Sequence, residues 1–341
     1  MKQLLNTLFV QTQGAYLRLD HETIKLEVER ETKLQVPLHH LGGLALFGNV
    51  LLSPFLLHRF CEDGRSVVWF GRGGRFKARL AGPTSGNVLL RRAQYEAHAN
   101  AERTTEIARN VVAGKIRNAR SVVQRAAREA EGGPNGLEAA SDDLARTLRE
   151  LGVARNLDEV RGLEGRAGRV YFDVFGEMVL GGGEGYAFSG RNRRPPRDRV
   201  NAVLSFVYAL VLGDCVAGCE GVGLDPQFGY LHALRSGRDS LALDLMEELR
   251  PVLADRLTLT LINRRQLSGG DFEERPGGAV QLTESGRKTV IFAYQKRKQE
   301  EILHPILDRK TPLGLVSHIQ ARLLARHLRG DAEHYMPFTP R

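Results

Sequence analysis

The sequence predicts an α+β fold, in which a small N-terminal antiparallel β domain is followed by a larger all-α domain. Up to about residue 85, apolar and polar residues alternate as they do in half-buried strands. After the turn-rich segment 81–87, apolar residues recur with the period of amphipathic helices. The chain has 341 residues, of which 42% are apolar, and this is enough to bury more than one core. We therefore expect domains at 1–85 and 91–341, joined by a linker at 86–90.

The first domain is predicted to contain strands and one short helix. Strands are predicted at 15–19, 24–28, 34–36 and 67–70, with a hairpin turn at 20–23. A helix is predicted over 53–61, because Ser53 is a good N-cap and Pro54 suits the first helical position.

The second domain has helical periodicity through most of its length. Helices are predicted at 89–131, 137–151, 158–181, 198–220, 239–256 and 311–329. The segment 257–291 is less regular, and 280–282 and 289–292 are candidates for a short hairpin. The most apolar stretch, 202–219, is interrupted by a serine and an aspartate. It is too short and too polar for a bilayer span, so we expect a buried core helix.

The charge balance favours a polyanionic partner. Lys and Arg number 49 and Asp and Glu 40, which gives a formal net charge of +9. The three cysteines cannot form a disulfide framework. The first 14 residues contain no sustained apolar run, so we expect no signal peptide and a cytoplasmic location.

An arginine stripe is predicted on the first long helix. Between Arg103 and Arg128 there are seven basic residues and one acid, Glu106. On a helical projection six of them share one arc, opposite the apolar residues: Arg103, Arg109, Arg117, Arg120, Arg125 and Arg128. Lys115 is the exception. A solvent-facing arginine stripe suits the phosphates of a DNA duplex, and an ordinary solvated face is the alternative.

Two further basic clusters are visible. Residues 191–199 contain five arginines around Pro195 and Pro196, and Asp198 is expected to cap the following helix. The third cluster is 296–298. Few aromatic residues accompany them, so contact with the DNA backbone is expected rather than base stacking.

Common cofactor and nucleophile motifs are missing from the sequence. The glycine-rich segments 71–75 and 181–185 lack the Gly-Lys-Ser/Thr of a phosphate-binding loop. Cys215 and Cys219 have no second pair nearby, so we expect buried apolar residues rather than zinc ligands. No Gly-x-Ser-x-Gly motif is present.

Acidic and imidazole residues in the second domain are the candidates for chemistry. Glu164 lies near a helix start, His232 ends a glycine-punctuated loop, and Asp244 and Glu247 share a helix face at i,i+3. Carboxylate oxygens and an imidazole suit Mg²⁺ or Mn²⁺, which phosphodiester chemistry requires. Each residue also has an ordinary structural explanation, and spacing does not show that they converge.

Several sequence blocks together resemble a known family. They are Phe47–Pro54, Arg91–Tyr95, Glu164–Ala167, Arg193–Asn201, Gly213–Cys215, Gly223–His232 and Asp244–Glu247. Over nearly its whole length the chain resembles the adaptation integrase of CRISPR systems, the first CRISPR-associated (Cas) protein. Its overall look is similar to the type I-C branch.

The resemblance implies an architecture, a metal site and a reaction. It implies a homodimer formed through the β domains, and two dimers flanking a dimer of a small partner, Cas-two, in a hetero-hexamer. It assigns catalytic metal ligation, with Mg²⁺ or Mn²⁺, to Glu164, His232 and Glu247 in the C-terminal helical domain, with Asp244 in support. The implied reaction inserts protospacer DNA into a CRISPR array by attack of a 3′-hydroxyl on a phosphodiester.

The leading hypothesis is therefore a metal-dependent DNA endonuclease and integrase that binds double-stranded DNA. Contact with the DNA backbone is predicted for Arg109, Arg117, Arg120, Arg191, Arg193 and Arg194. A non-catalytic DNA-binding scaffold and a stand-alone branched-DNA nuclease are the alternatives. A scaffold would bind DNA equally well with or without Mn²⁺ and would show no strand transfer.

Overall fold

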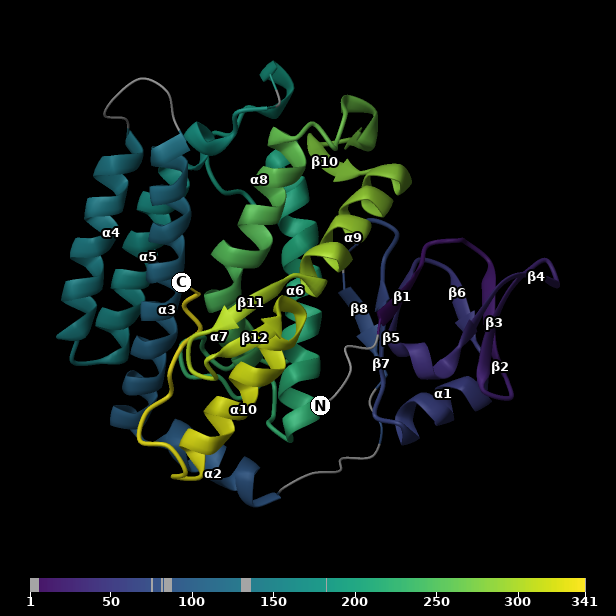
Figure 1. The fold of residues 1–341 in the computed structure, drawn as a ribbon, viewed down its shortest axis with the longest axis horizontal. Coiled ribbons are helices and arrows are strands. Elements are labelled where there is room, and N and C mark those ends of the chain that lie inside the picture. The colour runs from purple at the N-terminus through teal and green to yellow at the C-terminus, as the bar shows by residue number, and fades with distance from the viewer. Residues whose placement is uncertain are drawn as a thin grey trace. The chain divides into compact units, whose positions relative to one another are not determined.

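The computed structural model describes residues 6–74, 76–80, 82, 88–129, 136–181 and 183–340. The chain divides into two compact units, Met1–Gly86 and Asn87–Arg341, which are described separately (Figure 1). The first consists of β-sheets with one α-helix and the second is mainly helical, so the predicted α+β class is confirmed.

The N-terminal unit contains two four-stranded sheets. One has the order β4-β3-β2-β6, built from β2 (Ala15–Asp20), β3 (Thr23–Val28), β4 (Glu31–Pro37) and β6 (Val50–Leu52). The other has the order β1-β5-β7-β8, built from β1 (Asn6–Val10), β5 (Leu41–Phe47), β7 (Ser66–Phe70) and β8 (Phe76–Arg79). A short 3-10 turn, η1 (Leu38–His40), precedes β5.

These sheets are mixed, which differs from the purely antiparallel arrangement that the sequence predicted. β2 and β3 pair antiparallel, but β5 runs parallel to both β1 and β7. Parallel neighbours need a crossover, and α1 (Pro54–Glu62) lies in the connection between β5 and β7. The predicted helix is confirmed: Ser53 Oγ accepts the Leu56 N–H at 3.3 Å, and Pro54 is the first helical residue.

The second unit is built from helices with two short hairpins. Its α-helices are α2 (Val88–Ala99), α3 (Ala101–Glu129), α4 (Gly136–Gly152), α5 (Leu157–Asp173), α6 (Arg199–Val222), α7 (Ser240–Leu249), α8 (Arg256–Asn263), α9 (Glu284–Gln299) and α10 (Val316–Leu328). The hairpins are β9 (Phe272–Arg275) with β10 (Ala279–Leu282) and β11 (Glu301–His304) with β12 (Arg309–Pro312). Short turns are the π segment η4 (Arg250–Asp255) and the 3-10 turns η2 (Phe175–Met178), η3 (Gly183–Tyr186), η5 (Gly269–Asp271) and η6 (Leu313–Leu315).

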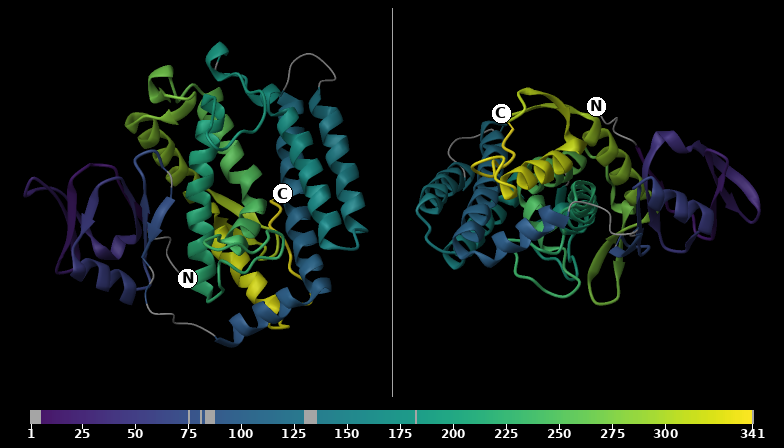
Figure 2. Two further views of the ribbon diagram at one scale, coloured as in Figure 1. Left: turned by 180° about the vertical axis from the view of Figure 1, so that it is seen from behind. Right: turned by 90° about the horizontal axis from the view of Figure 1, so that it is seen from below.

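Two packed groups of helices form the core of this unit. Helices α3, α4 and α5 pack against one another along their lengths, and α6 packs between α7 and α10 (Figures 1 and 2). By length and composition α6 could cross a membrane, since an 18-residue window has a mean hydropathy of 1.9. However, 61% of that window is buried inside the unit. The prediction of a buried core helix is confirmed, and the bounds of α6 differ from the predicted 198–220 by one residue at the start and two at the end.

Several predicted element boundaries were wrong, each for a local reason. The predicted helix 89–131 is two helices, because Asn100 Oδ1 accepts the Arg103 N–H at 3.0 Å and starts a new helix. The predicted helix 239–256 changes to a π segment at Arg250, where Pro251 has no N–H to donate.

The predicted hairpin and linker also differ from the structure. The strand at 280–282 is present as part of β10, but it pairs with β9, and 289–292 belongs to α9. Thr283 Oγ1 accepts the Gly286 N–H at 3.3 Å and so starts that helix. Residues 88–90 of the expected linker are helical, and its residues 86 and 87 lie outside the described residues. Of the turn-rich segment before it, residues 81 and 83–85 also lie outside them.

Candidate functional site

The predicted acidic and imidazole residues come together in the helical unit, from segments far apart in the sequence. Glu164 lies on α5, Asp244 and Glu247 lie on α7, and His232 lies in the loop between α6 and α7. His232 Nε2 is 3.7 Å from Glu247 Oε1. A lysine of α3, Lys115, contacts the carboxylates of both Glu164 and Glu247.

The loop that carries His232 is held by a buried glutamine of α2. Gln94 Nε2 donates to the carbonyl oxygens of Asp225 and Phe228, at 2.8 and 2.9 Å, and its Oε1 accepts the Asp225 N–H at 2.9 Å. Arg161 Nε adds a hydrogen bond to the Leu231 carbonyl at 2.8 Å. These contacts fix a loop that has no regular structure of its own. Sequence reasoning did not identify Gln94, which lies inside one of the resembling blocks.

Asp244 orients the histidine. Its Oδ2 accepts the backbone N–H groups of Tyr230 at 2.5 Å and Leu231 at 3.0 Å. Its Oδ1 accepts the His232 N–H at 3.0 Å and lies 2.7 Å from His232 Nδ1. An N–H at Nδ1 leaves the lone pair of Nε2 directed towards Glu247, which is the tautomer that a metal ligand requires. The supporting role expected for Asp244 therefore has a physical basis.

Glu247 is a buried carboxylate with two cationic side chains beside it. Burial would raise its pKa, but the charges of Arg250 and Lys115 more than offset this and hold the pKa at about 2. Arg250 Nη1 lies 3.0 Å from Oε1, and Lys115 Nζ lies 2.8 Å from Oε2. Glu247 is therefore ionised at neutral pH.

Lys115 joins the two glutamates of the site in this structure. Its ammonium lies between Glu164 and Glu247, and those two carboxylates raise its pKa even though burial alone would lower it. Among the described residues no three His, Cys, Asp or Glu side chains are placed to hold a metal ion. The sequence carried one signal for Lys115, since it was the basic residue of α3 that fell among the apolar positions.

The donor set nevertheless fits a divalent cation. Glu247 Oε2 is buried, and its partner among the described residues is the Lys115 ammonium at 2.8 Å, so this oxygen already lies against a positive charge. Two carboxylates and the Nε2 of an oriented imidazole are ligands that Mg²⁺ and Mn²⁺ accept. Glu164, His232 and Glu247 are therefore the residues that would hold such an ion.

Two members of the predicted arginine stripe on α3 are partly buried and hydrogen-bonded within the helical unit. Arg109 Nη2 donates to the Ala154 carbonyl at 2.7 Å, and Arg120 Nε donates to the Ser141 carbonyl at 3.1 Å. Helices α4 and α5 pack along α3 and cover this part of its surface, so both guanidiniums take part in packing between helices. Arg117 is exposed, as predicted.

The basic cluster at 191–199 also divides into structural and exposed members. Arg191 donates to Asn201 Oδ1 at 2.6 Å and to Ser205 Oγ at 3.1 Å, and burial lowers its pKa. It is therefore held by the start of α6 and is not free at the surface. Arg193 and Arg194 are exposed. The predicted cap is confirmed, since Asp198 Oδ1 accepts the Asn201 N–H at 2.7 Å.

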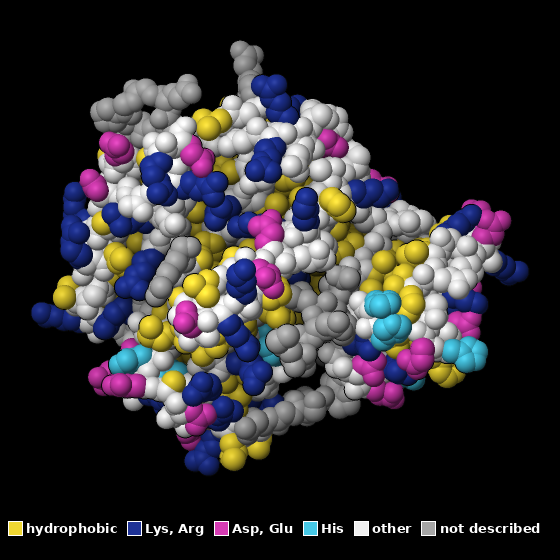
Figure 3. Space-filling view, in the orientation of Figure 1, with side chains coloured by type: hydrophobic (Ala, Val, Ile, Leu, Met, Phe, Trp, Pro, Cys, Tyr) yellow, Lys and Arg dark blue, Asp and Glu magenta, His cyan; other side chains and the backbone are white. Residues whose placement is uncertain are grey.

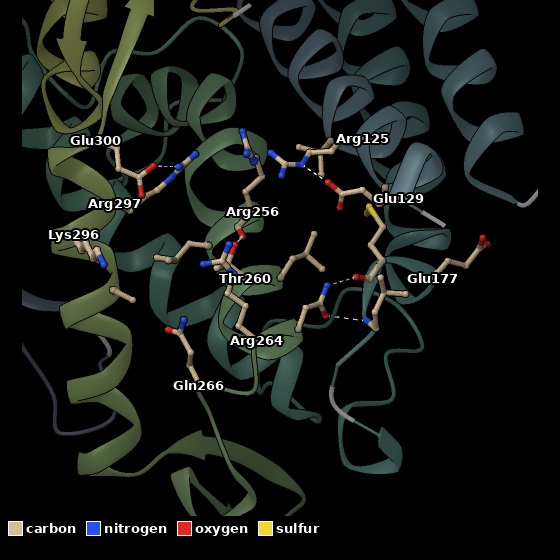
Figure 4. Close-up of a pocket in the computed structure, with 18 of the residues that line it drawn as sticks. Arg125, Glu129, Glu177, Arg256, Thr260, Arg264, Gln266, Lys296, Arg297 and Glu300 are labelled. Atoms are coloured by element: carbon tan, nitrogen blue, oxygen red, sulfur yellow. Dashed lines mark hydrogen bonds and ion pairs between the residues drawn. The ribbon is translucent and has the colours of Figure 1, made fainter. Parts of the chain in front are cut away.

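A separate groove of about 580 Å³ opens elsewhere on this unit, and it contains none of the predicted metal ligands (Figure 4). It lies among α3, α8 and α9, and its basic residues are Arg125, Arg256, Arg264, Lys296 and Arg297. Arg125 pairs with Glu129 at 2.8 Å, whereas Arg256 is half-buried and pairs with no described residue. Figure 3 shows Lys and Arg side chains spread over this face of the helical unit. The lining of this groove therefore does not include the acidic and imidazole residues described above.

Comparison with known sequences defines the class of protein. The chain matches the family "CRISPR associated protein Cas1" over residues 8–296. It is 58% identical to the CRISPR-associated endonuclease Cas1 1 of Moorella thermoacetica, over 100% of both chains. It is 49% identical to the CRISPR-associated endonuclease Cas1 2 of Rhodospirillum rubrum, over 99% of both chains. These relatives define a CRISPR-associated endonuclease. The chain belongs to the Cas1 family.

Solved structures share its fold. A CAS1 protein from Thermotoga maritima has a TM-score of 0.82 at 25% identity, covering 96% of this chain and 97% of that one. A casposase bound to its integration product has a TM-score of 0.84 at 20% identity, covering 97% and 93%. A Cas6-RT-Cas1–Cas2 complex has a TM-score of 0.84 at 20% identity, covering 99% of this chain and 36% of that one.

Proposed function

We propose that this Cas1 protein is a metal-dependent DNA endonuclease and integrase that inserts protospacer DNA into a CRISPR array. The observation that carries the proposal is that Lys115 contacts both Glu164 and Glu247 while His232 Nε2 lies 3.7 Å from Glu247, in a protein of this family. In the reaction, the 3′-hydroxyl oxygen of the protospacer bonds to phosphorus as the bond from phosphorus to the leaving 3′-oxygen of the array breaks. One phosphodiester replaces another, so no external energy source is needed. Water as the attacking group would give hydrolysis.

The residues have separate roles in this proposal. Glu164, His232 and Glu247 would hold Mg²⁺ or Mn²⁺, and Asp244 would keep Nε2 of the imidazole directed at the ion. Such an ion supplies a Lewis acid that polarises the phosphoryl oxygen and stabilises developing charge. Arg250, which is 3.0 Å from Glu247, keeps that carboxylate ionised.

The exposed arginines are the proposed contacts to DNA. Arg117, Arg193 and Arg194 are accessible, so they are better candidates than Arg109, Arg120 and Arg191. Arg256, which forms no ion pair with a described side chain, and the cations around it in the groove add a second surface suited to backbone phosphates. The net charge of +9 is consistent with this assignment.

The assembly is also part of the proposal. We infer a homodimer formed through the β domain (1–85), with the helical domain (91–341) carrying catalysis, and a hetero-hexamer with Cas2, in the cytoplasm. A Cas6-RT-Cas1–Cas2 complex and a casposase bound to integration product are among the proteins of similar fold, and they support these partners. The type I-C assignment rests on sequence resemblance. Size-exclusion chromatography with light scattering, with and without the cognate Cas2, tests the stoichiometry.

A non-catalytic DNA-binding scaffold is the alternative, and one observation favours it. Lys115 already compensates the charge of Glu164 and Glu247 without any metal. A decisive experiment is strand transfer of a labelled duplex into a supercoiled plasmid carrying a cognate array, with Cas2 added or omitted. Label that enters the plasmid with Mn²⁺, and is lost with EDTA or in Glu164→Ala, supports the integrase. Tight DNA binding without transfer in any condition supports the scaffold.

A further inference from the structure

Lys115 lies where two of the proposed metal ligands meet. Its Nζ is 2.8 Å from Glu247 Oε2 and also contacts Glu164 Oε1. The side chain comes from the apolar face of α3 and is 13% exposed. A salt bridge this buried is not explained by surface solvation, so its position has consequences for whatever else binds these carboxylates.

An ammonium and a divalent ion cannot both occupy this position. Oxygen ligands approach Mg²⁺ at about 2.0–2.1 Å. Glu164 and Glu247 would hold such an ion through carboxylate oxygens, and the Lys115 ammonium already contacts Glu164 Oε1 and Glu247 Oε2. Repulsion between the two cations adds to the competition for these oxygens. An ion held by both carboxylates in place of the ammonium would therefore require the lysine to move.

A small cavity next to the site offers a place for the displaced group. It has a volume of about 20 Å³ and is lined by Lys115, Tyr171, Tyr208, Arg250 and Asp255, among others. A cavity of this size holds about one water-sized group, and an ammonium is of similar size. The lysine therefore already borders the space into which it would move.

Asp255 supplies a carboxylate on the wall of this cavity. It accepts hydrogen bonds from Tyr208 Oη at 2.7 Å and Tyr171 Oη at 3.1 Å. In the described part of the chain it forms no ion pair with a Lys or Arg side chain, and burial raises its pKa to about 6. Arg250 also lines the cavity and would repel an ammonium there, so the carboxylate is needed to offset that repulsion.

We propose that Lys115 is a positioning residue that occupies the place of the metal ion, neutralises Glu164 and Glu247 until the ion arrives, and then moves into the cavity towards Asp255. This proposal rests on the metal site assigned above. It predicts that the lysine lowers the affinity for metal and keeps the empty site folded, and that Asp255 makes its displacement easier.

The first test measures Mn²⁺ binding to the full-length, metal-free protein by calorimetry and by electron paramagnetic resonance. Lys115→Met should bind Mn²⁺ at least about 10-fold more tightly than the wild type, because no ammonium has to leave. Its melting temperature in EDTA should fall, and the increase on adding Mn²⁺ should be larger than in the wild type. Lys115→Gln provides the same comparison if the methionine variant does not fold.

The control is Lys298→Met. Lys298 is a buried lysine of α9 paired with Asp214 at 2.7 Å, and neither residue is one of the proposed metal ligands. Its loss should lower the melting temperature and leave the Mn²⁺ affinity unchanged. Unchanged or weaker Mn²⁺ binding by Lys115→Met would overturn the proposal. Equal Mn²⁺ binding by the wild type and Glu247→Gln would instead refute the metal site itself, so the two failures can be distinguished.

The second test is a double-mutant cycle with Asp255→Asn, which keeps the shape of the side chain and removes its charge. In the wild-type background this variant should weaken Mn²⁺ binding about 10-fold, because the displaced ammonium has no counter-charge. In the Lys115→Met background it should have no effect. Equal effects in both backgrounds would overturn the movement towards Asp255.

Discussion

Two adjacent carboxylates of α7 have opposite electrostatic states, although both are buried. Glu247 faces Lys115 of α3, and the charges of Arg250 and Lys115 hold its pKa at about 2 in spite of burial. Glu248, the next residue, is turned towards the C-terminal segment, and burial raises its pKa to about 8. Neither the residue type nor the degree of burial distinguishes them, so the neighbouring charges decide.

Glu248 anchors the C-terminal segment with hydrogen bonds and not with ion pairs. Its Oε2 accepts the Phe338 N–H at 2.6 Å and the Gln320 amide at 2.9 Å, and its Oε1 accepts the Tyr335 hydroxyl. No described Lys or Arg pairs with it, and for this reason the donors do not outweigh the cost of burying its charge. Glu247 is thus an ionised carboxylate beside cationic side chains, whereas Glu248 is a carboxyl group held by hydrogen bonds.

The largest effect is expected when the charge of Glu247 is removed. Glu247→Gln keeps the volume of the side chain and removes the charge, so strand transfer should fall by at least about 100-fold and Mn²⁺ binding should be lost. Glu248→Gln is the matched control and should retain Mn²⁺ binding. Near-normal transfer by Glu247→Gln would remove that residue from the metal site.

The next effect concerns stability and comes from Glu248. Glu248→Ala leaves the donors of Tyr335, Gln320 and Phe338 without an acceptor, so the free energy of unfolding should fall by about 3 kcal/mol. Urea denaturation measures the loss, and limited proteolysis should show earlier cleavage near residue 335. A variant as stable as the wild type would show that these bonds contribute little.

A smaller effect is expected for the histidine support. Asp244→Asn keeps an acceptor but removes the charge next to His232 Nδ1, so Mn²⁺ affinity should fall by about 10- to 100-fold. The melting temperature in EDTA measures any accompanying loss of the loop contacts. If affinity is unchanged while stability falls, Asp244 holds the loop only.

Glu248 also predicts a dependence of stability on pH, with the sign set by its raised pKa. The folded state holds the proton up to about pH 8, whereas the unfolded state releases it near the ordinary value of 4.5. The contribution of this group to stability therefore falls as the pH rises between these values. In EDTA, the melting temperature of Glu248→Gln relative to the wild type should increase from pH 5 to pH 8.5. A constant difference would mean that the group does not titrate in this range.

The smallest effect is expected on α3, where the nearby residues Arg117 and Arg120 have different surroundings. Arg117 is exposed and Arg120 donates to the Ser141 carbonyl, so Arg117→Gln should weaken DNA binding and reduce its salt slope by about 1. Arg120→Gln should lower stability and leave the salt slope unchanged. Equal slopes for both variants would remove this part of α3 from the DNA surface.

Local patterns predicted much of the fold. Alternation located β2 and β3, and the Ser53–Pro54 pair located α1. The i,i+3 spacing of Asp244 and Glu247 predicted that they share one face of a helix, and both lie close to His232 in the structure. These features depend on residues close together in the chain, for which periodicity and capping are sufficient.

The remaining features depend on residues far apart in the chain. Nothing within α3 shows that α4 and α5 will cover Arg109 and Arg120. The contacts of Lys115 with Glu164 and Glu247 join three helices, and the opposite states of Glu247 and Glu248 follow from such contacts. A pattern within one helix cannot contain this information.

The C-terminal anchor has a consequence for the cooperativity of local unfolding. Asn118 Nδ2 donates to the carbonyls of both Glu248 and Phe338, at 2.8 Å each, and a Cβ on Gly114 would lie 2.7 Å from the Cβ of Pro337. The turn of α3 that carries Lys115 is therefore packed against the segment around residue 338. Local opening of that segment would remove packing from this turn, so we expect the exchange of amide hydrogens around Lys115 and around residue 338 to be coupled.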